Sequence, residues 1–321
     1  MKNQYFVSRR IASRCTGSML LLFLVTGCGT HTPQSSGTLI QARSGFKTTL
    51  TPQNDPKEAV LQAPPDVFRT VTYPAPSGEL AAYVSPDPGD GKQHPVIIWI
   101  HGGDSSSIGD EWSPRTRDND QSAAAYRNAG ILMMFPSLRG GNENPGVKEG
   151  FLGEVDDVLA AARYLETQKY VDPKRIYLGG HSTGGTLALL EAEYTDGFRA
   201  VFSFGPIDDV SHYGSDSGFL PFDISNQKEV ELRSPGFWLN SIQSPVWVFE
   251  GTEGSSNARS LRAMARSSTS VNAHFIQVRG ATHFTTLAPI NELIAQKILQ
   301  DTGEPSTLSF TEDEVNQKFA K

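Results

Sequence analysis

The chain has 321 residues, with 35 acidic and 28 basic side chains and a formal net charge of −7 at pH 7. No part of it forms the basic stripe that neutralises phosphates, so the composition argues against a nucleic-acid partner. The sequence contains no His or Cys cluster with metal-ligand spacing and no glycine-rich phosphate loop. We therefore expect neither a metal ion nor a nucleotide cofactor.

The first 27 residues have the pattern of an export signal. Four cations, with no acidic residue among them, precede an apolar run at residues 19–25. That run is too short to cross a bilayer, which needs about 20 apolar residues. It ends in Val25-Thr26-Gly27-Cys28, which resembles the bacterial lipobox. The resemblance implies a lipoprotein signal peptide over residues 1–27 and a lipid on Cys28; the alternative is a plain secretory signal with an incidental cysteine.

The residues around Cys28 also bear on location. Cys15 would leave with the signal, so the mature chain would keep one lipidated cysteine and no internal disulfide. Gly29 is not Asp, and by resemblance to lipoprotein sorting rules this implies the periplasmic face of the outer membrane in a diderm bacterium. The expected membrane contact is therefore a lipid anchor.

Thr, Ser, Gln and Pro dominate residues 28–66, which predicts a flexible tether. Alternating strands and helices then predict an α/β domain over residues 67–302. A charged C-terminal tail follows at residues 303–321, where we expect a loosely attached helix. The expected strands are 68–73, 79–84, 96–100, 131–135, 175–179, 200–204, 246–250 and 273–278. The expected helices are 121–128, 154–167, 186–194, 259–266 and 289–299. Continuous apolar strands of this kind predict a mostly parallel eight-stranded sheet with helices on both faces. The long connection at residues 205–244 predicts a small cap insertion over the active site.

Gly180-His181-Ser182-Thr183-Gly184 lies between a predicted strand and a predicted helix. A serine on such a sharp turn needs small neighbours, and the turn presents its hydroxyl at a helix N-terminus. In this context the G-x-S-x-G pattern predicts that Ser182 is the nucleophile of an α/β-hydrolase.

Three regions of the core stand out: residues 172–185 around the serine, residues 233–235 with 242–246 before a late strand, and Gly280-Ala281-Thr282-His283-Phe284. They resemble the corresponding regions of the prolyl oligopeptidase family. The resemblance covers residues 68–300 and implies an α/β-hydrolase fold and serine hydrolysis of an amide or ester. True oligopeptidases carry a large β-propeller before this domain, and here fewer than 50 residues of the mature chain precede it, so peptide specificity does not carry over.

A serine hydroxyl needs a base to take its proton. In this fold the base follows the last core strand, which selects His283 among the seven histidines. His181 adjoins the nucleophile on a tight turn, and we expect a structural role for it.

The acid that orients the base stays open. The family pattern places an Asp after the seventh strand, where this chain has Glu250-Gly251-Thr252-Glu253-Gly254. Glu253 is our first expectation. Glu250, at the end of the strand, is an alternative, as are Asp208 and Asp209 after the preceding strand.

Backbone N–H groups must bind the oxyanion of the tetrahedral intermediate. The N–H of Thr183, directly after the nucleophile, is one expected donor. The second should come from His101-Gly102-Gly103, which resembles the His-Gly-Gly motif of esterases and peptidases; Gly103 is favoured slightly over Gly102.

Together these motifs predict a lipid-anchored serine hydrolase of the cell envelope, acting on a small ester or short peptide through an acyl-enzyme on Ser182. The alternative is a degenerate hydrolase fold retained for binding or scaffolding, which the missing Asp would permit.

Overall fold

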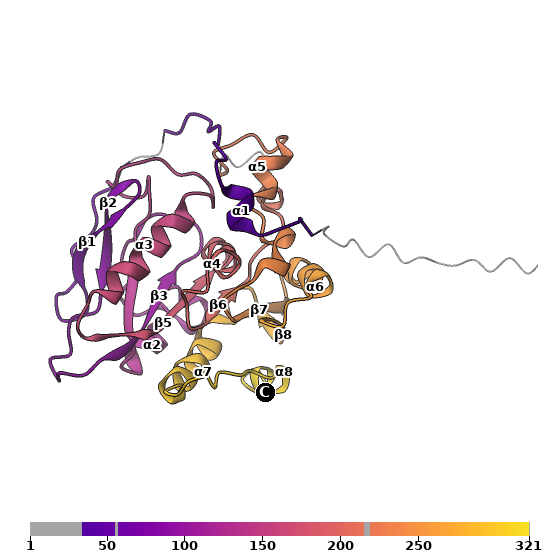
Figure 1. Cartoon of the computed structure of the whole chain (residues 1–321). Helices are drawn as coiled ribbons and strands as arrows, with labels where there is room; N and C mark the ends of the chain where they lie inside the picture. Colours follow the sequence, from indigo (N-terminus) through magenta and orange to yellow (C-terminus); the bar gives the residue numbers. More distant parts are fainter. Residues whose placement is uncertain (1–33, 55–56, 215–218, 321) are drawn as a thin grey trace, which may run out of the picture. The chain divides into compact units, whose positions relative to one another are not determined.

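A computed structural model describes residues 34–54, 57–214 and 219–320. The predicted signal peptide and Cys28 lie outside this range. Eight strands form one sheet in the order β1-β2-β4-β3-β5-β6-β7-β8 (Figure 1). They are β1 (Arg69–Ala75), β2 (Gly78–Val84), β3 (His94–Ile100), β4 (Leu132–Pro136), β5 (Val171–His181), β6 (Val201–Phe204), β7 (Val246–Glu253) and β8 (Ala273–Thr282). The β1–β2 and β2–β4 pairs are antiparallel and the others are parallel, which confirms the predicted sheet.

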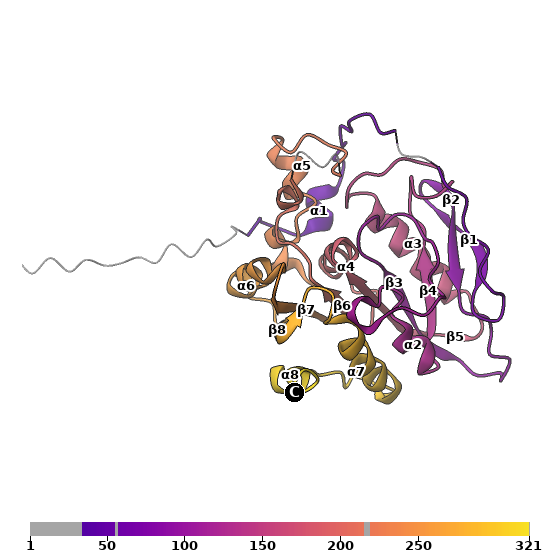
Figure 2. The ribbon, with the colours of Figure 1, turned by 180° about the vertical axis from the view of Figure 1, so that it is seen from behind.

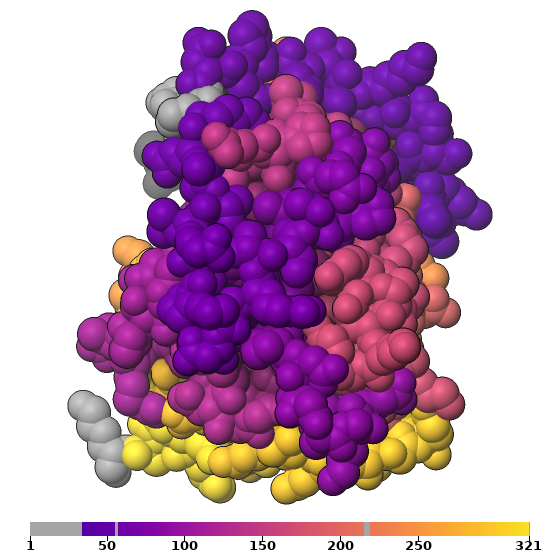
Figure 3. Space-filling model, turned by 90° about the vertical axis from the view of Figure 1, so that its left-hand side faces the viewer, coloured from indigo at the N-terminus to yellow at the C-terminus, as the bar shows by residue number. Residues whose placement is uncertain are grey.

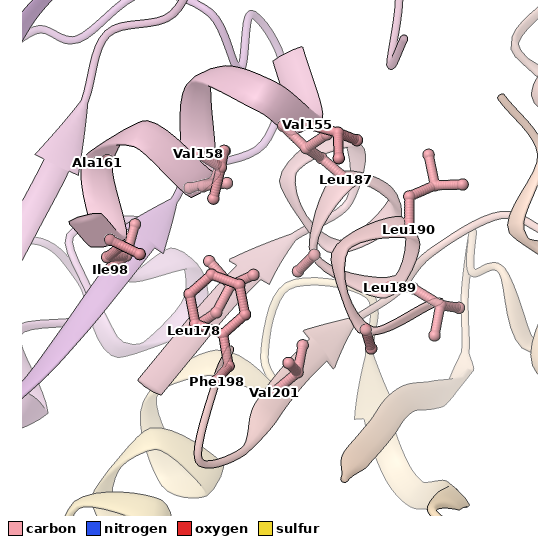
Figure 4. Packing of buried hydrophobic residues seen from close by; sticks show 14 of the residues in the cluster. Ile98, Val155, Val158, Ala161, Leu178, Leu187, Leu189, Leu190, Phe198 and Val201 are labelled. Carbon is pink, nitrogen blue, oxygen red and sulfur yellow. The ribbon is translucent and has the colours of Figure 1, made fainter. Parts of the chain in front are cut away.

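Helices cover both faces of the sheet. They are α1 (Leu39–Arg43), α2 (Ala124–Asn128), α3 (Glu154–Glu166), α4 (Thr183–Tyr194), α5 (Gln227–Glu231), α6 (Ala258–Ser267), α7 (Leu287–Gln300) and α8 (Glu312–Gln317). On one face, Ile98 and Leu178 pack against α3 and α4 through Val158 and Leu187 (Figure 4). On the other face, residues of α2 and α7 pack against Trp99. Because both faces are covered, the central strands carry runs of buried apolar residues on both faces.

The segment predicted to be a flexible tether packs against the domain in its described part. Leu39 is fully buried in α1, which lies beside α5 of the cap (Figures 1 and 2). The Arg43 guanidinium donates to the backbone oxygens of Phe151 at 2.8 Å and Leu232 at 2.7 Å. Leu50 forms a β-bridge with Phe222. The prediction was wrong for these residues because composition does not register side-chain bonds to distant backbone.

The C-terminal tail is also packed over its described residues. Val315 of α8 is fully buried, and Phe310 is nearly so. Lys297 on α7 forms an ion pair with Glu314 on α8 at 2.9 Å. Figure 3 shows the side of the molecule on which β1 lies. The N-terminal part of the chain, in indigo and purple, covers much of this surface, and the C-terminal part, in yellow, lies along the lower edge of the view. We therefore correct the expectation of a loosely attached tail.

Candidate active site

Ser182 lies between the end of β5 and the start of α4 in a strained backbone conformation, with φ 55° and ψ −112°. Such angles are costly for a residue with a side chain and persist only where the surroundings enforce them. The N–H of Ser182 donates to the Phe204 oxygen at 2.7 Å, which fixes the turn on the neighbouring strand β6. A Cβ at Gly184 would lie 2.1 Å from the Ile100 oxygen, so only glycine fits there. The local structure is the serine turn that the sequence predicted.

His283 follows β8 and meets a carboxylate from β7. Its Nδ1 lies 2.9 Å from Oε2 of Glu250, and the Glu250 side chain is 1% exposed. The other carboxylate oxygen accepts the N–H of Gly251 at 2.9 Å. Because Nδ1 faces Glu250, Nε2 is the ring nitrogen left to take a proton from a nucleophile.

The described packing holds this pair close to the serine turn. The His283 ring centroid is 4.5 Å from that of His181, the residue before Ser182. Gly205, directly after β6, has φ +59°, and a Cβ there would lie 2.4 Å from both Glu250 and His283. Base, acid and serine turn therefore meet at the carboxyl ends of neighbouring parallel strands, where open α/β sheets place their sites.

The structure corrects our first expectation for the acid. Glu253 is exposed, and the Thr252 hydroxyl donates to it at 3.2 Å. The reason is that β7 continues to Glu253 through pairing with β8, with a register shift between Gly251 and Glu253. The carboxylate that contacts His283 therefore comes from within the strand, at Glu250, and not from a loop after it.

Asp208 and Asp209 have other partners. Asp208 accepts from the Ser260 hydroxyl at 2.7 Å and lies 3.2 Å from His212. Asp209 accepts the N–H of Ser211 at 2.8 Å and caps the short 3-10 helix η2 (Val210–Tyr213). Neither carboxylate is placed to orient His283.

Two N–H groups beside Ser182 suit an oxyanion. Thr183 is the first residue of α4, so its N–H has no acceptor within the helix. The Thr183 hydroxyl donates to the Gly103 oxygen at 2.9 Å, which ties the loop after β3 to the serine turn. The N–H of Gly102 donates to Oε1 of Gln121 at 3.0 Å. The Gly102 N–H is therefore occupied, which leaves the N–H of Gly103 as the expected second donor.

Gln121 links the oxyanion loop to the base, a role that the sequence did not reveal. Its Nε2 donates to Nδ1 of His181 at 2.8 Å, while Nε2 of His181 lies 3.0 Å from the His283 backbone oxygen. Burial, with the nearby His283 as a smaller cause, lowers the pKa of His181 to about 3. His181 is therefore neutral near pH 7, accepts a hydrogen bond from Gln121, and donates one to the backbone of His283.

Replacing His181 by alanine should lower kcat by about 10- to 100-fold with little change in KM, because the base loop loses the bond that positions it. Turnover of an activated ester tests this expectation. A thermal unfolding curve, recorded on the same protein, verifies that the variant is folded. His274→Ala removes an exposed histidine of β8, whose ring stacks on Trp247, and serves as the control. A kcat within threefold of wild type in His181→Ala would contradict the positioning role.

Ser182 and Thr183 line a cleft of about 900 Å³. The loop after β3 forms one part of its wall, and Tyr213, Phe219 and Pro221 of the cap insertion form another. Glu58, from the segment before β1, also lines it. The cap and the N-terminal segment thus shape the space in front of the serine.

Among the residues described, no group of three or more His, Cys, Asp or Glu side chains is arranged to hold a metal ion. Over the same ranges, no helix is both long and apolar enough to cross a membrane.

The sheet order, the strained serine turn after β5 and the His283–Glu250 pair define an α/β-hydrolase fold. Residues 118–243 match the prolyl oligopeptidase family of peptidases. Over this region, which is less than half of its length, the chain is similar to that family.

Individual proteins are also similar to part of the chain. The chain is 28% identical over 160 residues to a probable dipeptidyl-aminopeptidase B of Aspergillus terreus, covering 47% of this chain and 17% of that protein. It is 26% identical over 217 residues to the acylamino-acid-releasing enzyme of Rattus norvegicus, covering 60% of this chain and 28% of the enzyme. It thus spans less than a third of these relatives.

A puromycin-hydrolyzing peptidase of Mycobacterium tuberculosis superposes with a TM-score of 0.57 and 21% identity, covering 73% of this chain and 39% of that one. At this identity the likeness establishes the shared fold.

Proposed function

We propose that the protein is a serine hydrolase of the peptidase type, which cleaves a short peptide or a small ester through an acyl-enzyme on Ser182. The observation that carries the proposal is the pair of His283 and buried Glu250 beside the strained serine turn. The names of the relatives, which are peptidases, support the same class.

In the proposed reaction, the Ser182 hydroxyl oxygen attacks the carbonyl carbon of the substrate while Nε2 of His283 takes its proton. Glu250 stabilises the imidazolium, and the N–H groups of Thr183 and Gly103 bind the oxyanion. His283 then gives the proton to the departing amine or alcohol, which leaves an ester on Ser182. Water, deprotonated by the same histidine, hydrolyses that ester and restores the enzyme.

A fluorophosphonate probe tests the proposal, because it reacts covalently only with an activated serine. We expect labelling of the folded protein at Ser182, located by peptide mass spectrometry. Folded protein that remains unlabelled would refute the enzyme and restore the binding alternative. That alternative rested on the missing Asp, and Glu250 supplies the carboxylate in its place. Rates on short acyl esters and on aminoacyl amides then separate esterase from peptidase.

The proposal includes a lipid anchor in the cell envelope, supported by the lipobox-like Val25-Thr26-Gly27-Cys28. Bacterial cells that express the full chain should incorporate labelled palmitate into it, and the protein should sediment with membranes. Cys28→Ala should abolish both results, while Cys15→Ala should leave the mature protein lipidated. Membrane-bound, labelled Cys28→Ala protein would exclude this anchor.

A further inference from the structure

The cleft in front of Ser182 contains a buried carboxylate that the proposed reaction does not use. Glu154, the first residue of α3, lines the cleft and is 3% exposed. Its Oε1 accepts the N–H groups of Glu149 at 2.6 Å and Gly150 at 3.1 Å. Its Oε2 is buried and has no hydrogen-bond partner within the described ranges. A buried carboxylate oxygen without a donor is costly, which makes this atom a candidate for contact with a ligand.

The two nearby guanidinium groups donate to other acceptors. Arg139 donates to both oxygens of Asp157 at 2.8 and 2.9 Å and to Glu149 at 2.7 Å. Arg233 donates to Glu229 and to the Glu149 backbone oxygen. Burial is the main cause that raises the pKa of Glu154, so a bound cation would stabilise its ionised form.

The rest of the cleft also favours a cation. Besides Glu154, four carboxylates line it against two cations, Arg115 and Lys148, and Lys148 is paired with Asp104 at 3.1 Å. Apolar side chains stand among these charges, with Phe151 stacked on Tyr213 at a centroid distance of 5.8 Å and Leu187 in the same wall. A fitting ligand therefore combines an apolar group with a positive charge.

We propose that Glu154 binds the protonated α-amino group of the substrate, so that the enzyme selects peptides or aminoacyl esters with a free amino terminus. An ammonium brings several N–H donors, one of which would satisfy Oε2 with a charge-assisted bond. The apolar side chain of the substrate would lie against Phe151, Leu187 and Tyr213. This inference rests on the proposed hydrolysis at Ser182.

Matched substrates test the inference. Phenylalanine p-nitroanilide and alanyl-phenylalanine p-nitroanilide are each compared with their N-acetylated forms. The wild type should show a kcat/KM about 10- to 100-fold higher for the free amine of at least one pair, as expected for a charge-assisted bond. Glu154→Gln keeps an oxygen for the two backbone donors but removes the charge. It should bring that ratio close to one and leave the acetylated substrate unaffected within about twofold.

Glu166→Gln makes the same change at the exposed end of α3 and should leave the ratio as in wild type. Fluorophosphonate labelling separates the two proposals. Labelled wild-type protein that cleaves neither pair, or that cleaves the free and acetylated forms equally, overturns the role of Glu154 while the serine hydrolase stands. If labelled Glu154→Gln keeps the wild-type ratio of kcat/KM between free and acetylated substrates, the role of Glu154 is likewise overturned while the serine hydrolase stands. The wild-type ratio remains decisive if that variant fails to fold.

Discussion

Replacing Ser182 by alanine should eliminate fluorophosphonate labelling and lower kcat by about 10⁴- to 10⁶-fold. Alanine removes the oxygen that forms the acyl-enzyme but leaves the cleft and the N–H groups of Thr183 and Gly103 in place. Residual turnover should therefore come from substrate binding and oxyanion stabilisation alone. Turnover of the best ester or amide substrate gives the magnitude, and labelling of the purified protein gives the independent readout.

Ser225→Ala is the matched control, because Ser225 is an exposed serine of the cap insertion. Its labelling and its kcat should equal those of wild type. If Ser182→Ala protein still reacts with the probe, another serine is the nucleophile and the role of the turn after β5 must be abandoned.

Replacing Glu250 by glutamine should lower kcat by about 10⁴-fold, the loss typical of a triad whose acid becomes neutral. The amide can donate to Nδ1 of His283 and so favour the tautomer whose Nε2 carries the proton, which cannot act as a base. The neutral amide also cannot stabilise the positive charge of the His283 imidazolium as the Glu250 carboxylate does. Because glutamine is the same size as glutamate, the packing around Gly205 should be retained, and circular dichroism can verify the fold.

Glu253→Gln is the matched control, three residues along the same strand with an exposed side chain. Its kcat should remain within threefold of wild type. The reverse result, a large loss in Glu253→Gln and a small one in Glu250→Gln, would show that the end of β7 rearranges to supply the acid from Glu253.

The sequence alone could single out Ser182 and His283 as candidates, because their places in the chain depend on local structure. Gly180 and Gly184 flank Ser182 within one turn, and that turn needs only a strand before it and a helix after it. His283 was identified by its position between the last strand and the last helix. Periodicity and turn residues alone give that order of elements.

The acid and the packed N-terminal segment depend on contacts between distant residues. Whether Glu250 or Glu253 reaches His283 is decided by how far β7 pairs with β8 and by the register shift between them. Residues 34–54 look like a linker by composition, yet Leu39 is buried and Arg43 donates to carbonyl oxygens more than 100 residues away. Neither the choice of Glu250 nor the packing of residues 34–54 can be inferred from a short stretch of sequence.

The early packing of the chain would limit how far the domain can lie from the proposed lipid anchor. Gln34 already donates to the Gly236 oxygen at 2.6 Å, and five residues separate it from Cys28. If Cys28 carries a lipid as proposed, a fully extended connection reaches only about 20 Å from the anchor. A flexible tether that ended near residue 66, as first expected, would have allowed the domain to lie much farther from the anchor. The packed segment would instead keep the catalytic cleft within about one domain diameter of the bilayer surface, where only substrates arriving at that surface can be cleaved.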